Sequence, residues 1–392
     1  MSSRAAAADT GRPVPPVEAP GRRRFLGTVV AAAVTTALPA TAHAAPRGPR
    51  RLFLGTYTSV AGGGAGIGLA AYDDTTGHIT ATGTVTGVGD PSFLALHPSG
   101  STLYTVNERQ DGAVTAVRLS SDGRHQVLGS RATGGAGPCH LSVHPGGNWL
   151  LSANYTSGSV AVHPIEASGA LGARTALVTH SAPPPGPGQG GPHAHQIITS
   201  PDGGHVLAVD LGTDTVYTYR LDTARGTLTA VSRATVRPGA GPRHLTFHPS
   251  GRYAFLANEL DNTVAVCGYD PATGRLTPGA PQPTGAGPGT SYPAQLAVTR
   301  DGRFAFLANR GHNSLTRYAV EDGGARLRLL GTVPVGGDHP RHIALSPSQN
   351  LLFAANQRSS TVSVFHVDRT TGELRPAGGP FRFPVAVCAL PL

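Results

Sequence analysis

Short apolar runs, separated by turns rich in Gly, Pro, Asp and Ser, recur along this chain at regular intervals. The clearest copies read HPSGRYAFLANE, from His248, and TRDGRFAFLANR, from Thr299. In each copy a turn is followed, ten positions later, by Asn or Asp at the end of an apolar run. The turns begin at His97, His144, Ser200, His248, Thr299 and Ser346, and the paired residues are Asn107, Asn154, Asp210, Asn258, Asn309 and Asn356. A period of about fifty residues indicates an array of equivalent structural units.

Each repeat contains the pattern of four short strands. In the repeat that starts at Gly241, GPRHLTF predicts a first strand and residues 253–258 a second. A third strand is expected over 263–269, and a turn at 270–274 leads to a fourth. Short, evenly spaced strands with Gly/Pro turns and no helical periodicity favour an all-β fold. Four strands per repeat at this period predict a β-propeller.

The two ends of the array predict how the ring closes. Residues 51–83 match the second, third and fourth strands of a repeat, and residues 383–387 match a first strand. The C-terminal strand should therefore complete the N-terminal blade, which gives seven blades and leaves no free edge there. A Pro/Gly run at 183–192 lengthens one loop, and it is either a surface insertion or a lid.

The N-terminal stretch has the pattern of an export signal. Arg22, Arg23 and Arg24 precede an apolar run that ends at Leu38, and Ala42-His43-Ala44 supplies a small-x-small cleavage site. The run is shorter than the roughly 20 residues of a membrane-spanning helix, so no membrane anchor is expected. We therefore predict a twin-arginine signal peptide at 1–44, a propeller domain at 45–392, and a location outside the cytoplasm.

Composition excludes several classes of function. The formal charge of +9 is spread without like-charge blocks or aromatic-basic interleaving, so nucleic-acid binding is not expected. Three scattered cysteines, Cys139, Cys267 and Cys388, argue against disulfides and a structural zinc site. No HExxH or EF-hand pattern occurs, so neither a metal nor a cofactor is expected. Nothing indicates oligomerisation, and a monomer is predicted.

Equivalent positions near the start of the first strand carry unlike residues. The first such position holds Ser92, Cys139, His195, Arg243, Ala294, Arg341 and Val385. The next holds Phe93, His140, Gln196, His244, Gln295, His342 and Ala386, and the position after the repeat Asn/Asp holds Glu108, Tyr155, Leu211, Glu259, Arg310 and Gln357. Uneven polar residues at one shared face indicate a ligand site, although an ion-pair network around the axis is also compatible. The repeat Asn/Asp residues are expected to be structural.

Several stretches together carry a family resemblance. They are LFLGTYT (52–58), GPHAHQ (191–196), VDLGTD (209–214), GPRHLTFHPSGRYAFLANEL (241–260) and FLANRGHNSL (306–315). With them the chain resembles the lactonase family of seven-bladed β-propellers, which includes propeller-type 6-phosphogluconolactonase and fungal carboxymuconate cyclase. The resemblance implies a catalytic group of one His, two Arg and one Glu, which falls on His195, Arg243, Arg310 and Glu259. Ala194 departs from the family motif, which often has Pro.

These residue types suit metal-independent opening of a lactone, which needs an activated water and positive charge at the developing oxyanion. As a hypothesis, His195 is the general base and Glu259 orients it or shares the proton transfer. Arg243 and Arg310 would bind an anionic substituent of a sugar-type lactone and stabilise the oxyanion. Further substrate-binding candidates are Gln196, His244, Arg341 and His342.

Other functions stay open at this point. The chain is alternatively a non-enzymatic exported binding propeller, or a cycloisomerase that acts on a carboxylated lactone. A metal-dependent propeller lactonase that uses acidic and Asn side chains is a further alternative.

Overall fold

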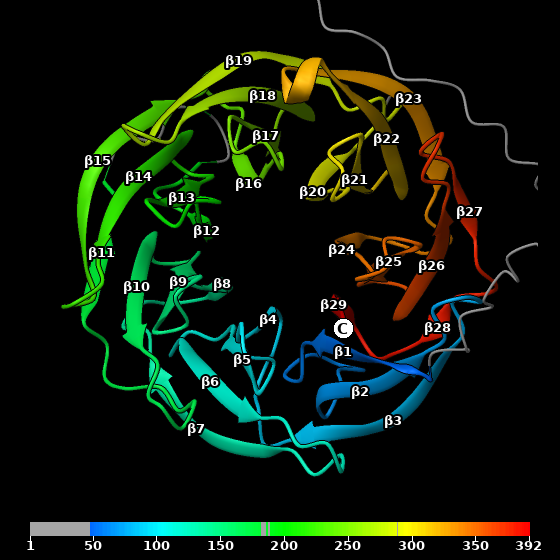
Figure 1. The fold of residues 1–392 in the computed structure, drawn as a ribbon, viewed down its shortest axis with the longest axis horizontal. Helices are drawn as coiled ribbons and strands as arrows, with labels where there is room; N and C mark the ends of the chain where they lie inside the picture. Colours follow the sequence, from blue (N-terminus) through cyan, green and yellow to red (C-terminus); the bar gives the residue numbers. More distant parts are fainter. Residues whose placement is uncertain (1–47, 182–185, 187–188, 288) are drawn as a thin grey trace, which may run out of the picture. The chain divides into compact units, whose positions relative to one another are not determined.

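The computed structural model describes residues 48–181, 186, 189–287 and 289–392, and all that follows concerns the compact unit Arg47–Leu392. The predicted signal peptide and its cleavage position after Ala44 lie outside the described residues. Seven antiparallel sheets stand in a ring around a central axis (Figure 1). This arrangement confirms the predicted all-β propeller. Among the described residues no helix is both long and apolar enough to cross a bilayer.

Each sheet forms one blade, with its first strand nearest the axis and its last strand at the outside (Figure 1). We number the blades from 1 to 7 in chain order. Blade 1 consists of β29 (Ala386–Pro391), β1 (Arg50–Thr56), β2 (Gly66–Tyr72) and β3 (Ile79–Thr86). Blade 2 consists of β4 (Leu94–Leu96), β5 (Thr102–Asn107), β6 (Ala113–Arg118) and β7 (Gln126–Ala132). Blade 3 consists of β8 (Pro138–Val143), β9 (Trp149–Asn154), β10 (Ser159–Pro164) and β11 (Ala176–Thr179).

The remaining blades repeat this order. Blade 4 consists of β12 (Ala194–Thr199), β13 (Val206–Asp210), β14 (Thr215–Asp222) and β15 (Thr227–Thr235). Blade 5 consists of β16 (Pro242–Phe247), β17 (Tyr253–Asn258), β18 (Thr263–Asp270) and β19 (Arg275–Pro283). Blade 6 consists of β20 (Tyr292–Val298), β21 (Phe304–Arg310), β22 (Ser314–Glu321) and β23 (Arg326–Pro334), with the 3-10 turn η1 (Asp322–Gly324). Blade 7 consists of β24 (Pro340–Leu345), β25 (Leu351–Asn356), β26 (Thr361–Val367) and β27 (Leu374–Pro376), and β28 (Phe381–Arg382) also pairs with β26.

The C-terminal strand closes the ring as predicted, but its register differs. β29 pairs with β1, and Gly55 lies opposite Cys388. The strand begins at Ala386, whereas the sequence placed it at 383–387, because Val385 has a φ of 42° and forms a turn ahead of the strand. Val387 and Cys388 therefore occupy the two positions that the sequence had assigned to Val385 and Ala386.

Apolar contacts between neighbouring blades form the core. Between blades 5 and 6, for example, Phe255, Val264, Leu296, Leu307 and Tyr318 are buried against one another. Alternating side chains of every inner strand supply such contacts, so each blade covers the apolar face that the next blade presents. Burial of these side chains is the main stabilising term of the ring.

The repeat Asn residues fix the turn between the second and third strands. Asn154, Asn258, Asn309 and Asn356 each donate Nδ2 to the hydroxyl five residues later, over 2.9 to 3.2 Å. Four copies of the repeat residue thus share the structural role expected from the sequence.

Asp210 does not share this role. Its Oδ2 lies 2.6 Å from His180 Nδ1, and its Oδ1 accepts hydrogen bonds from the backbone N–H groups of His193 and Thr213. The amide of Asn has a single acceptor oxygen, so only a carboxylate can serve both sets of donors. His180 and His193 flank the Pro/Gly run, part of which lies outside the described residues, and Asp210 holds the chain on both sides of it.

Candidate active site

In several blades a β-bulge in the first strand directs one side chain toward the axis. In β16 the register shifts between Pro242 and His244, which leaves Arg243 outside the ladder. The same shift occurs around His195 in β12 and around Arg341 in β24. A bulge redirects the extra residue, and these three side chains all line one small cavity. The second strand of each blade ends on the same side of the ring as this cavity. Glu259 follows β17 and Arg310 ends β21, so both residues lie near the cavity.

Glu259 joins two arginines. Its Oε2 lies 3.0 Å from Arg243 Nε and 2.5 Å from Arg310 Nη2. Burial raises the pKa of Glu259, but the charges of Arg310 and Arg243 outweigh it and hold the pKa below its ordinary value. The carboxylate is therefore ionised at neutral pH.

Arg310 is also held by the backbone of blade 6. Its Nε donates to the carbonyl of Tyr292 and its Nη2 to the carbonyl of Pro293, at 3.2 and 3.1 Å. Together with the ion pair to Glu259, these bonds commit the guanidinium to contacts within the protein. Its position is fixed before any ligand binds.

Arg243 has spare hydrogen-bonding capacity. The side chain is only 2% exposed, and its Nε and Nη1 have no hydrogen-bond partner among the described residues. Arg243 Nε lies within ion-pair distance of the Glu259 carboxylate, but its N–H is not oriented to donate a hydrogen bond to that carboxylate. Burial, followed by the charge of Arg310, lowers the pKa of Arg243 to about 9. Because buried polar groups nearly always find a partner, these N–H groups are suited to a bound water or substrate oxygen.

His195 is buried, and its ring lies edge-on to Tyr155 and to His244, with centroids 5.6 and 5.1 Å away. Its Nδ1 has no hydrogen-bond partner within the described part of the chain. Burial and the charge of Arg243 lower the pKa of His195 well below its ordinary value. The imidazole is therefore neutral at neutral pH and able to accept a proton.

His195 and Arg243 face the same cavity. Its volume is about 10 Å³, which is close to the minimum that one water molecule requires. The residues that line it are Ser92, Phe93, Cys139, His195, Arg243, His244, Arg341, His342 and Val387. A proton acceptor and a cationic hydrogen-bond donor thus meet at a space the size of one water molecule.

Comparison with known proteins identifies the family of the chain. Residues 51–391 match the model of the family described as lactonase, 7-bladed beta-propeller. The chain belongs to this lactonase family. A 6-phosphogluconolactonase of Bacillus subtilis is 32% identical over 342 residues, covering 86% of this chain and 96% of that protein.

Solved structures of similar proteins have the same fold. The periplasmic gluconolactonase of Pseudomonas aeruginosa is 30% identical, with a TM-score of 0.82 and coverage of 88% of this chain and 99% of that one. A putative 6-phosphogluconolactonase of Bacteroides fragilis is 27% identical, with the same TM-score and coverage of 89% and 99%. Family membership identifies the chain as a lactone-hydrolysing enzyme.

The other predicted substrate-binding residues of this lactonase divide into two groups. His244 and Arg341 line the cavity. The Oε1 of Gln196 accepts from the backbone N–H of Leu245, 2.6 Å away, and the Nδ1 of His342 accepts from Ala389 at 3.4 Å. Gln196 and His342 therefore bridge neighbouring blades, and His342 also touches the cavity.

Three polar residues near the lactonase cavity were absent from the predicted site. Glu108 Oε2 accepts from Tyr57 Oη at 3.0 Å and from Ser92 Oγ, and its Oε1 lies 3.7 Å from Arg341 Nη2. The sequence contained a signal for Glu108, which follows Asn107 as Glu259 follows Asn258. Ser92 stands at the repeat position that also holds His195 and Arg243, whereas Tyr57 gave no such signal.

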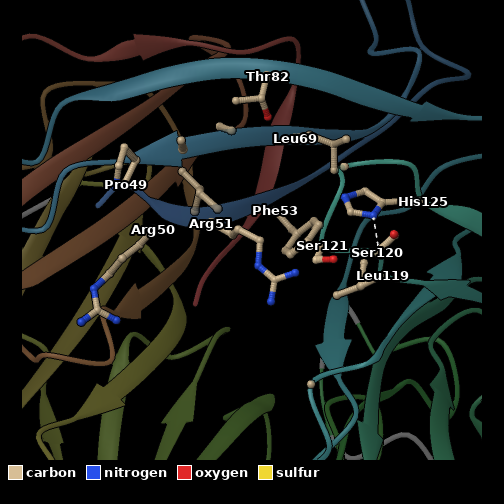
Figure 2. Close-up of a pocket in the computed structure, with 15 residues that line it drawn as sticks. Pro49, Arg50, Arg51, Phe53, Leu69, Thr82, Leu119, Ser120, Ser121 and His125 are labelled. Atoms are coloured by element: carbon tan, nitrogen blue, oxygen red, sulfur yellow. Dashed lines mark hydrogen bonds between the residues drawn. The ribbon is translucent and has the colours of Figure 1, made fainter. Parts of the chain in front are cut away.

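A second pocket of the lactonase, of about 580 Å³, contains none of these residues (Figure 2). Arg51 and Phe53 of blade 1 and Leu119 and His125 of blade 2 line it. It lies at the start of β1, whereas the candidate site lies where β1 and the other second strands end. No group of three or more His, Cys, Asp or Glu side chains suited to a metal ion is present in the described ranges.

Proposed function

We propose that the chain hydrolyses a sugar-type lactone, with 6-phosphogluconolactone as the first substrate to test, at the cavity that His195 and Arg243 line. The observation that carries the proposal is the placement of these two side chains against a space for one water molecule. The names of the Bacillus and Pseudomonas relatives support a sugar lactone as substrate. Two arginines that line the cavity, Arg243 and Arg341, favour a substrate with an anionic substituent.

In the proposed mechanism, the neutral imidazole of His195 takes a proton from a water molecule as the water attacks the lactone carbonyl. The carbonyl oxygen becomes an oxyanion, and the unpartnered N–H groups of Arg243 stabilise it. When the intermediate collapses, the bond between the carbonyl carbon and the ring oxygen breaks. The imidazolium then returns its proton to the departing oxygen, and the product is the open hydroxy acid.

Glu259 acts in this mechanism through the arginines. No hydrogen bond or ion pair joins Glu259 to His195 in the described part of the chain, whereas both Arg243 and Arg310 contact the same carboxylate oxygen. We therefore assign Glu259 to positioning Arg243, with Arg310 fixing the carboxylate from the other side. This role differs from the orienting of His195 that the sequence suggested.

The predicted signal peptide at 1–44 supports a second proposal, which concerns the location of the protein. The twin-arginine pattern at Arg22–Arg24 and the cleavage site that ends at Ala44 support export of the mature chain. Immunodetection of the full-length protein in cell and medium fractions tests this proposal, with Arg22→Lys/Arg23→Lys as the variant that should remain inside and uncleaved.

Activity should be tested on purified protein that starts at Ala45. The substrates are 6-phosphogluconolactone, glucono-1,5-lactone and an unsubstituted aliphatic lactone, each with and without chelator and corrected for spontaneous hydrolysis. We expect turnover that favours the phosphorylated lactone and resists the chelator, and its loss in His195→Ala. Absence of turnover with all three lactones would refute the proposal, and chelator-sensitive turnover would refute the metal-independent mechanism.

A further inference from the structure

A second charged cluster lies across the cavity from Glu259. We call Tyr57, Ser92, Glu108 and Arg341 the recognition cluster. Tyr57 follows β1 in blade 1, Ser92 and Glu108 flank strands of blade 2, and Arg341 belongs to β24 of blade 7. His195, Arg243, Glu259 and Arg310 come from blades 4, 5 and 6. Ser92 and Arg341 line the same cavity as His195 and Arg243, so the cavity lies between the two groups.

Glu108 is held firmly from one side. Tyr57 Oη and Ser92 Oγ both donate to its Oε2. Its other oxygen lies 3.7 Å from Arg341 Nη2, which is too far for a hydrogen bond. Glu108 therefore attracts the Arg341 guanidinium by charge and leaves the N–H groups of Arg341 available.

Arg341 differs in this respect from Arg310. No hydrogen bond from the Arg341 side chain occurs among the described residues, whereas Arg310 donates to two carbonyls and pairs with Glu259. The Arg341 side chain is only 18% exposed. A largely buried guanidinium has lost hydrogen bonds to water. A ligand anion can take the place of that water by accepting from the unused N–H groups.

The charges of the two groups do not balance. Arg243 and Arg310 share the single carboxylate of Glu259, and Arg341 faces Glu108. One positive charge is thus in excess of the negative ones, and Arg341 is the arginine with the loosest pairing. A bound anion beside Arg341 would cancel this excess in a region of low solvent access.

We propose that Arg341 is the specificity-determining residue that binds an oxyanion group of the ligand, either a phosphate on the lactone or the carboxylate of the acid that hydrolysis forms. Glu108, fixed by Tyr57 and Ser92, is the positioning residue that directs the Arg341 guanidinium toward the cavity. The link to a lactone substrate rests on the proposed function, but the binding of the anion does not require turnover. Binding and turnover can therefore be tested separately.

The binding test is calorimetric titration of the wild type, Arg341→Gln and Arg341→Lys with three stable probes. The probes are glucose 6-phosphate, gluconate and 6-phosphogluconate, and Arg358→Gln is the control, because Arg358 is an exposed arginine of the same blade. Loss of a charged hydrogen bond should weaken binding in Arg341→Gln by about 10- to 100-fold, with a smaller loss in Arg341→Lys. A loss confined to the two phosphorylated probes identifies phosphate as the group, and a loss confined to the two that carry a carboxylate identifies carboxylate.

Three outcomes of the titration overturn the proposal. They are equal affinity of the wild type and Arg341→Gln for every probe, an equal loss in Arg358→Gln, and no binding of any probe by the wild type. Thermal melting of each variant shows whether it folds, and Arg341→Lys keeps the test valid if Arg341→Gln does not fold.

Steady-state kinetics test the positioning role of Glu108. With 6-phosphogluconolactone as substrate, both Glu108→Gln and Tyr57→Phe should raise KM and change kcat little. The rise in KM should be larger for Glu108→Gln than for Tyr57→Phe. With the neutral glucono-1,5-lactone the rise in KM should be smaller in both variants if phosphate is the group bound. A fall in kcat at unchanged KM would overturn the positioning role. If the wild type turns over no lactone, the proposed function fails, and the titration still decides the role of Arg341.

Discussion

Nη2 of Arg310 lies 2.5 Å from Oε2 of Glu259, in a region where neither side chain is more than 16% exposed. The same oxygen also faces Arg243. One carboxylate thus separates two arginines that would otherwise repel each other with little solvent to screen them. The stability of this part of the ring and the orientation of Arg243 depend on the same negative charge.

Glu259→Gln should therefore reduce both stability and activity. Removing one partner of a buried ion pair costs about 3–5 kcal/mol, and here two arginines lose their counter-charge. Urea unfolding monitored by the fluorescence of Trp149 measures the change in the free energy of unfolding. The double variant Glu259→Gln/Arg310→Gln should recover part of the stability and none of the activity. A single variant as stable as wild type would contradict this account of the pair.

The dependence of activity on pH should reflect the buried position of His195. Burial and the charge of Arg243 lower its pKa well below the ordinary value of 6.5. Its neutral, proton-accepting form then persists as the pH falls through 6.5, where an exposed histidine would become charged. We expect kcat/KM for a lactone to stay level from pH 7.5 to below 6.5, and His195→Gln to lose about 10²–10⁴-fold. A decline centred at 6.5 would mean that His195 is not the base or is not buried.

Acid should destabilise the ring through its buried histidines. Burial lowers the pKa of His140 and of His342 to about 3, from 6.5. The unfolded chain binds these protons first as the pH falls, so the free energy of unfolding decreases from about pH 6.5 toward 3. Each such histidine contributes a slope of at most ~1.4 kcal/mol per pH unit.

His342→Gln isolates one of these contributions. Glutamine already accepts a backbone N–H at the equivalent position, Gln196. The variant should fold at neutral pH and show a pH slope lower by about one proton, measured by urea unfolding between pH 4 and 7. An unchanged slope would show that His342 does not stay neutral in the folded state.

Asp210→Asn should destabilise blade 4, although Asn is the residue that the other blades use. It removes the charge beside His180 and one of the two acceptor oxygens, and hydrogen bonds to charged groups contribute about 1.5–3 kcal/mol each. Urea unfolding measures the loss, and Asp122→Asn, in an exposed turn, serves as the matched control. Equal stability of Asp210→Asn and wild type would show that the carboxylate is dispensable.

The sequence predicted the blades and brought several residues of the candidate site together because both depend on local patterns. Strand length, turn residues and the spacing to the repeat Asn are properties of neighbouring residues, and they located His195, Arg243 and Arg341 at one equivalent position. The one register error, at Val385, arose where a positive φ ends the similarity to the repeat.

Contacts that depend on exact strand register or on the packing of neighbouring blades were not predictable in the same way. The sequence could not show that Arg310 is held by the carbonyls of Tyr292 and Pro293, because this depends on the register of β20 against β21. Tyr57 of blade 1 meets Glu108 of blade 2 only because these two blades lie side by side in the closed ring.

The pairing of β29 with β1 sets the order in which the protein can be completed. The innermost strand of blade 1, β29, follows every other described strand in the chain, while its partner β1 precedes them all. Until β29 has been synthesised, β1 has an unpaired edge, and such edges can pair with other chains. The backbone N–H of Leu392 donates to the carbonyl of Arg51, so a truncation that removes Leu392 already removes part of the contact between β29 and β1. The ring therefore closes only after the strands of all other blades have been synthesised.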